Sequence, residues 1–138
     1  MKTRLICSLA AALLAAAGLY AQSSQTLVAN VPFGFHVGSV ALPAGEYSVD
    51  MRAAPGFVRL ASADHKSMAI IGTFATQAPE YNEQGKLIFN RYGDNYFLSQ
   101  VWPPGVTGRG IAKSNREKEM ASNAGQAGRA TLLAKTAK

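Results

Sequence analysis

The residues best suited to acid–base chemistry near neutral pH are two histidines, His36 and His65. Asp64 directly precedes His65, and Ser62 and Ser67 lie nearby, so the side-chain types of a serine hydrolase are present. A nucleophile, its base and the orienting carboxylate normally come from separate structural elements and not from one turn. We therefore interpret residues 62–67 as a solvated turn and predict no catalytic residue. A secreted hydrolase that uses His65 or His36 stays open as the alternative.

Metal and glycosidase chemistry have less support. Two histidines among scattered carboxylates lack the ligand spacing of a zinc site, and no calcium-binding loop pattern occurs in the 138 residues. A glycosidase needs two carboxyl groups at a set separation. Nothing in the sequence pairs any of the candidates, which are Glu46, Asp50, Glu80 and Asp94. We predict no metal, no cofactor and no enzymatic activity.

Aromatic side chains are concentrated in one segment, residues 86–102. A hairpin with bulky rings on both faces cannot bury both faces against one sheet. If the second face is uncovered, it forms a platform for a sugar or a partner protein; otherwise a loop or the C-terminal helix covers it. Our candidate binding residues are Arg91, Tyr92, Tyr96 and Trp102, with Arg91 adding a hydrogen-bonding or cation–π contact.

Positive charge is concentrated at the C-terminal end. Residues 22–108 hold five Lys and Arg against six Asp and Glu, a net charge of −1, whereas residues 109–138 hold seven against two, a net charge of +5. This end is either a solubilising terminus or a contact for an anionic surface. The candidate electrostatic contacts are Arg109, Lys113, Arg116 and Lys118.

The N-terminal residues have the pattern of a secretory signal peptide. Lys2 and Arg4 precede an apolar run that ends before Ala21. The run is about 15 residues long, which is shorter than the roughly 20 needed to cross a bilayer. We predict a signal peptide over residues 1–21, a periplasmic or extracellular location, and no transmembrane segment after cleavage. The only cysteine, Cys7, leaves with the signal peptide, so no disulfide is expected.

Residues 22–108 are predicted to form an all-β domain, because apolar and polar side chains alternate along much of this segment. About six to eight short strands separated by Gly and Pro favour a small antiparallel β-sandwich or barrel. Asp50, Arg52 and Arg59 interrupt any continuous lipid-facing band, which argues against an outer-membrane barrel.

The last hairpin of this domain is predicted in most detail. Its strands cover residues 86–92 and 95–102, and glycine at the first turn position, Gly93, fits a two-residue type II′ turn. The resulting register pairs Phe89 with Leu98 and Asn90 with Phe97.

Weaker signals define the remaining segments. Pro55 and Gly56 suit a type II turn. Residues 68–75 have no polar face, which indicates a central strand, and residues 77–85 are predicted to be a loop. A run of glycines then indicates a flexible exit from the domain: Gly105, Gly108 and Gly110.

Residues 109–138 are predicted to form a basic tail that contains a short helix. Ser114 and Glu117 have the spacing of a capping box, and residues 115–121 are good helix formers. Gly125 and Gly128 then weaken the helix, so we expect the rest of the tail to be flexible.

Four segments of the chain have recognisable sequence motifs: VPFGFHVG at residues 31–38, LPAGEYSV at 42–49, KLIFNRYGDNYFLSQVW at 86–102 and KSNREKE at 113–119. Together they resemble a group of small secreted bacterial proteins, and the resemblance covers most of the chain after the leader. Such proteins usually carry glycine at the position of His65. The resemblance implies export and an all-β fold. It implies no catalytic role, because the group has no established activity.

The functional prediction is an exported, non-enzymatic binding module of the periplasm or envelope. It would present the last hairpin to an envelope protein or polysaccharide, with the basic tail as an auxiliary contact. A passive envelope component is a further alternative. A nucleic-acid partner is not expected outside the cytoplasm.

Overall fold

A computed structural model describes residues 26–124 and 127–137 of the chain. The predicted signal peptide and Cys7 lie outside these residues. The described residues form one helix, α2 (Asn115–Ala124), and eleven strands. The strands are β1 Thr26–Val31, β2 Phe35–Val37, β3 Val40–Leu42, β4 Gly45–Ala54, β5 Phe57–Ser62, β6 Met68–Gly72, β7 Phe74–Asn82, β8 Gly85–Tyr92, β9 Asn95–Trp102, β10 Gly105–Gly110 and β11 Gly128–Thr136.

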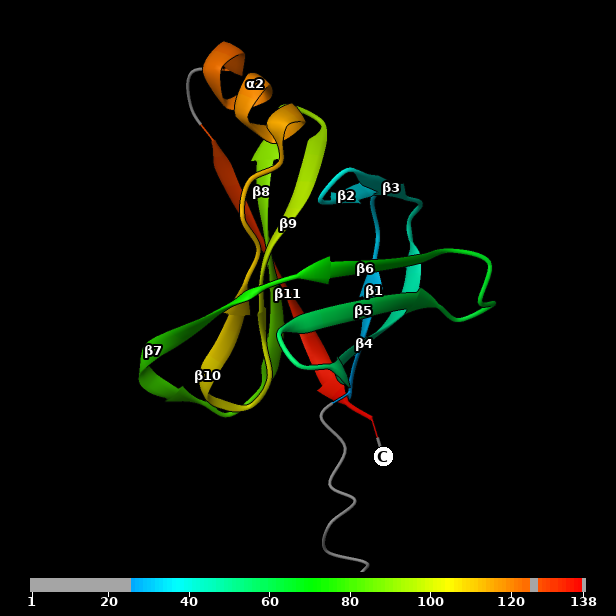
Figure 1. Ribbon diagram of the computed structural model, residues 1–138, viewed down its shortest axis with the longest axis vertical. Coiled ribbons are helices and arrows are strands. Elements are labelled where there is room, and N and C mark those ends of the chain that lie inside the picture. The colour runs from blue at the N-terminus through cyan, green and yellow to red at the C-terminus, as the bar shows by residue number, and fades with distance from the viewer. Residues whose placement is uncertain (1–25, 125–126, 138) are drawn as a thin grey trace, which may run out of the picture.

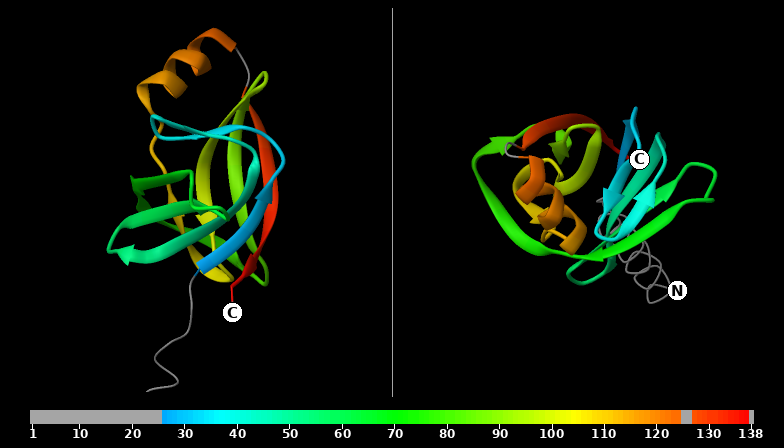
Figure 2. Two further views of the ribbon diagram at one scale, coloured as in Figure 1. Left: turned by 90° about the vertical axis from the view of Figure 1, so that its right-hand side faces the viewer. Right: turned by 90° about the horizontal axis from the view of Figure 1, so that it is seen from above.

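The strands form one sheet that curls into a barrel-like shape (Figures 1 and 2). Its main order is β3-β2-β9-β8-β11-β1-β4-β5-β6, and β10 connects β9 to β7. Only Thr73 separates β6 from β7. Because β6 pairs with β5 and β7 pairs with β10, this nearly continuous segment connects the two ends of the sheet. Apart from a short parallel contact between β2 and β9, neighbouring strands are antiparallel. The all-β prediction is confirmed, but six to eight strands is too few.

The strand count was too low partly because β7 and β10 were predicted to be a loop and a flexible exit. These segments pair with each other from Gly110 opposite Phe74 to Gly105 opposite Asn82. The glycines of β10 make room for rings: a Cβ on Gly108 would lie 2.5 Å from the Trp102 ring, and one on Gly110 would lie 2.4 Å from the Phe74 ring. Glycine therefore marks close packing here and not flexibility.

The prediction of a flexible tail is wrong for residues 128–136. They form β11, which lies between β1 and β8 in the sheet. Ala134 is buried, and Ala130 and Leu132 pack against the core on the same side of the strand. This alternation is built largely from alanine, which made the strand hard to distinguish from a weak helix. The β domain therefore does not end at residue 108.

The core lies inside the curled sheet and supports the predicted hairpin. Leu27, Val49, Leu60, Leu87 and Val101 are fully buried there. In the hairpin of β8 and β9, Phe89 pairs with Leu98 and Asn90 pairs with Phe97, as predicted. At its turn, Gly93 has a φ of 61°, which a type II′ turn requires. Gly56 has a φ of 77°, which fits the type II turn predicted after Pro55.

Strand β6 is not central, contrary to the prediction for residues 68–75. It is the last strand of the main order, and Ile70 is 59% exposed and Phe74 is 54% exposed. An apolar strand can therefore lie at the margin of a sheet, and the hydrophobicity of residues 68–75 was not sufficient to predict where in the sheet they lie.

Helix α2 lies at one end of the barrel-like sheet, and the C-terminal end of β11 lies at the other (Figures 1 and 2). The helix begins where the capping box predicted it, because the Glu117 backbone N–H donates to Ser114 Oγ over 3.2 Å. Within the described ranges, no helix has the length and apolar character needed to cross a bilayer.

Candidate functional site

Two of the predicted binding residues, Tyr92 and Trp102, are buried. Tyr92 is 3% exposed and donates its hydroxyl hydrogen to Glu117 Oε2 over 2.8 Å, so α2 covers it. Trp102 is 6% exposed, and its Nε1–H donates to Gln100 Oε1 over 2.8 Å. Neither ring is available to stack on a ligand. Of the two alternatives, cover by the C-terminal helix holds for Tyr92, and Gly108 fits against the Trp102 ring. Neither residue forms an uncovered aromatic platform.

The other two predicted binding residues contact each other and the core. The Tyr96 ring stacks on Phe33 with centroids 3.7 Å apart, and the Arg91 guanidinium lies 5.7 Å from the Tyr96 centroid. Arg91 Nε–H also donates to the carbonyl of Gly93 over 2.8 Å. The predicted cation–π contact is therefore made within the chain, between cross-strand neighbours.

The residues of the hydrolase alternative form a local turn. The Ser62 hydroxyl donates to Asp64 Oδ1 over 2.5 Å, and the Ser67 backbone N–H donates to Ser62 Oγ over 3.0 Å. The hydrogen bond from Ser62, followed by that from the Lys66 backbone, holds the pKa of Asp64 below its usual value. His65 has a φ of 59°, which places it in the left-handed region. These contacts are those of the solvated turn that we predicted.

His36 lies elsewhere, on β2. Its ring stacks on Phe97 with centroids 4.7 Å apart. Burial lowers the pKa of His36, and the positive charge of Arg116 adds to this shift, so the neutral ring is favoured. Across the described residues, no three His, Cys, Asp or Glu side chains gather as metal ligands.

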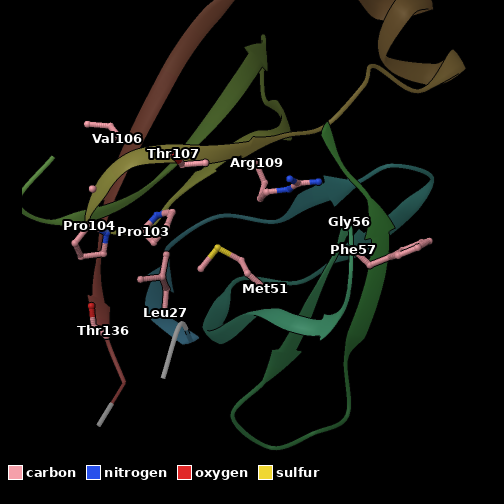
Figure 3. A pocket seen from close by; sticks show the side chains of 11 residues that line it. Leu27, Met51, Gly56, Phe57, Pro103, Pro104, Val106, Thr107, Arg109 and Thr136 are labelled. Atoms are coloured by element: carbon pink, nitrogen blue, oxygen red, sulfur yellow. The ribbon is translucent and has the colours of Figure 1, made fainter. Parts of the chain in front are cut away.

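The predicted electrostatic contacts do not lie together. Lys113, Arg116 and Lys118 are exposed in and just before α2. Arg109 is half-buried in β10, and its side chain extends toward the turn between β4 and β5. It therefore belongs to a different part of the molecule (Figures 1 and 3).

Arg109 lines a pocket in the described part of the chain that has a volume of about 600 Å³. We call it the mouth pocket, because it lies at the end of the barrel-like sheet away from α2. Its walls come from five strands, β1, β4, β5, β10 and β11, and from the β4–β5 and β9–β10 turns. Figure 3 shows the side chains that surround it, and those used below are Leu27, Met51, Phe57, Pro103, Thr107 and Arg109.

Hydrogen bonds to Thr73 hold one side of the mouth pocket in place. Arg109 Nε–H donates to Thr73 Oγ1 over 2.7 Å, and Arg109 Nη2–H donates to the Thr73 carbonyl over 3.0 Å. Thr73 in turn donates from its backbone N–H over 2.8 Å and from its hydroxyl over 2.9 Å to the carbonyl of Gly56. The β4–β5 turn, the β6–β7 junction and β10 are thus joined around one residue, which orders the pocket wall before any ligand arrives.

Sequence reasoning missed the mouth pocket. Its residues come from five strands and two turns, and their spacing has no pattern. The usable signals are the pair Pro103 and Pro104, which turns the chain at the pocket, and Arg109, which the charge pattern places in the basic tail and the structure places in β10.

Comparison with protein-family models, curated proteins and solved structures finds no match to this chain.

Proposed function

We propose that the protein is an exported, non-enzymatic binding protein and that it binds a small, largely apolar ligand in the mouth pocket. The observation that carries this proposal is the pocket itself. Its volume of about 600 Å³ is within the usual range for small-molecule sites, and the mouths of β-barrels are a common place for such sites. Export is supported by the leader pattern of residues 1–21.

Binding is favoured over catalysis by the side chains that line the pocket. None of them is His, Cys, Ser, Tyr, Lys, Asp or Glu. Arg109 is the one ionisable group in the lining, and a guanidinium does not release its proton at neutral pH. The pocket can therefore hold a molecule but has no group that moves a proton.

This proposal replaces presentation of the last hairpin as the means of binding. The rings of Tyr92 and Trp102 are buried, so the hairpin has a structural role in this state. The exposed cations Lys113, Arg116 and Lys118 remain candidates for an auxiliary contact with an anionic envelope surface or polysaccharide.

Titration of residues 22–138 with the neutral fluorescent probe N-phenyl-1-naphthylamine tests the proposal. Thr107 is exposed in β10 and lines the pocket, whereas Thr131 is exposed in β11 outside it. Thr107→Trp should fill the pocket and weaken probe binding at least tenfold, while Thr131→Trp should leave it unchanged. An unsubstituted protein that does not bind the probe, or equal effects of the two substitutions, would contradict the proposal. The first result would favour a passive envelope component.

A further inference from the structure

The charge of Arg109 has no carboxylate partner among the described residues. The one ion pair found there joins Arg59 Nη2 to Asp50 Oδ2 at 3.3 Å. Asp50 precedes Met51 on β4, and its second oxygen, Oδ1, already accepts the backbone N–H of Arg52 over 2.8 Å. Both oxygens of the Asp50 carboxylate thus have partners other than Arg109, and Thr73 contributes only neutral oxygens to the guanidinium.

The geometry of Arg109 leaves part of the guanidinium available. A guanidinium carries five N–H donors. Hydrogen bonds to Thr73 use one on Nε and one on Nη2, so the side chain is fixed in direction while other donors remain. Its planar fork suits an oxyanion that accepts two hydrogen bonds at once.

The surroundings of Arg109 strengthen its attraction for an anion. Leu27, Met51, Phe57 and Pro103 line the same pocket and carry no charge. A charge beside apolar walls interacts more strongly with a counter-charge than the same charge in open water does. The same walls provide apolar area for the remainder of a ligand.

From these observations we infer that the ligand of the mouth pocket is a free anionic amphiphile, with a carboxylate-like group at Arg109 and a hydrocarbon body along Met51 and Pro103. This inference rests on the proposed function and adds the chemical class of the ligand. A single acyl chain with an acidic head is the simplest molecule of this class.

Decanoate and decan-1-ol, which have equal chain lengths, test the inference through displacement of N-phenyl-1-naphthylamine. Decanoate should bind at least tenfold more tightly than decan-1-ol. Arg109→Gln should remove this preference and leave decan-1-ol binding nearly unchanged, which also reports that the pocket is intact. Arg109→Lys keeps the charge without the planar fork and should give an intermediate preference.

Arg52→Gln is the matched control, because Arg52 is an exposed residue of β4 next to Met51 in the sequence and its replacement also removes one positive charge. It should not change the preference for decanoate. Equal binding of decanoate and decan-1-ol by the unsubstituted protein, or a preference that survives Arg109→Gln, would overturn the inference and leave the proposed function standing. Failure of the probe and of both ligands to bind would instead overturn the proposed function.

The same anionic chemistry is present on a phospholipid headgroup. Co-sedimentation with vesicles of phosphatidylglycerol distinguishes a lipid headgroup from a free ligand. Co-sedimentation that is lost in Arg109→Gln, without binding of decanoate, would assign Arg109 to a membrane surface and overturn the free ligand. Decanoate binding without Arg109-dependent co-sedimentation supports it.

Discussion

The hydroxyl of Tyr92 donates to Oε2 of Glu117 over 2.8 Å and joins β8 to the first turn of α2. Asn90 Nδ2 donates to the same oxygen over 2.9 Å. Glu117 is only 4% exposed, so its carboxylate exchanges water for these two partners. The capping box predicted Glu117 as a helix residue, whereas its side chain acts mainly as the contact between helix and sheet.

Replacement of Glu117 by Ala should therefore destabilise the protein by about 2–3 kcal/mol, because it leaves the buried Tyr92 hydroxyl and the Asn90 amide without their acceptor. Urea unfolding gives the free energy. Glu119→Ala is the matched control, since Glu119 is exposed in the same helix, and it should change stability by less than about 0.5 kcal/mol. Equal effects of the two substitutions would show that the buried contact contributes nothing.

Tyr92 should make stability fall in alkaline solution. Burial, together with the hydrogen bond to Glu117 and its charge, raises the pKa of Tyr92 to about 12 from 10.0. The unfolded chain releases this proton near pH 10, so the contribution is complete below that pH and is lost as pH rises toward 12.

The free energies of unfolding of the unsubstituted protein and of Tyr92→Phe, measured at about pH 9 and about pH 11.5, test this point. The unsubstituted protein should lose more stability between the two pH values than Tyr92→Phe does. Tyr47 also has a raised pKa but is present in both proteins, so its contribution cancels. Parallel losses would contradict the assignment to Tyr92.

The hairpin of β8 and β9 could be predicted from sequence to the level of residue pairs near its turn. Gly93 occupies a turn position that requires a positive φ, and the two-residue turn fixes the register as far as Phe89. This signal is local. The shift in register between Ile88 and Phe89 was not predicted. The strands β7, β10 and β11 could not be predicted in this way, because their evidence is tertiary: the space beside Gly108 is filled by Trp102, and Ala134 is buried only because β1 and β8 flank it.

The candidate site also combines residues that the sequence identifies with contacts that only the tertiary structure shows. Arg109 was identified as a cation from sequence, but its partner Thr73 is 36 residues away along the chain. No spacing rule connects them. Tyr92 was predicted as a candidate binding residue, with cover by the C-terminal helix as the alternative. The helix does cover Tyr92, but the sequence did not indicate that Glu117 makes the contact.

Gly108→Ala should destabilise the protein by about 1–3 kcal/mol, because the added methyl group would overlap the Trp102 ring, 2.5 Å away. Trp102 is the only tryptophan, so its fluorescence reports the change directly. Gly72→Ala is the matched control on β6, where a Cβ meets only Phe57 Cε1 at 3.7 Å. If both variants unfold at the same urea concentration, the close packing of β10 is not what glycine provides.

His65→Gly should stabilise the protein by about 0.5–1 kcal/mol, because His65 has a φ of 59° and glycine adopts this conformation without a Cβ penalty. Lys66→Gly, in the same turn, should instead be neutral or destabilising. Thermal unfolding of the two variants measures the difference. A loss of stability in His65→Gly would mean that the imidazole makes a contact worth more than the backbone strain. Any hydrolysis that depends on His65 would also disappear in this variant.

The position of β11 between β1 and β8 has a consequence for aggregation. β11 pairs with β1 at Leu27 and Val28 and with β8 from Gly85 to Arg91. Without β11, both strands would present unpaired backbone groups along one side, and such open strand edges pair readily with other chains. The insertion of β11 therefore protects the molecule from edge-to-edge association.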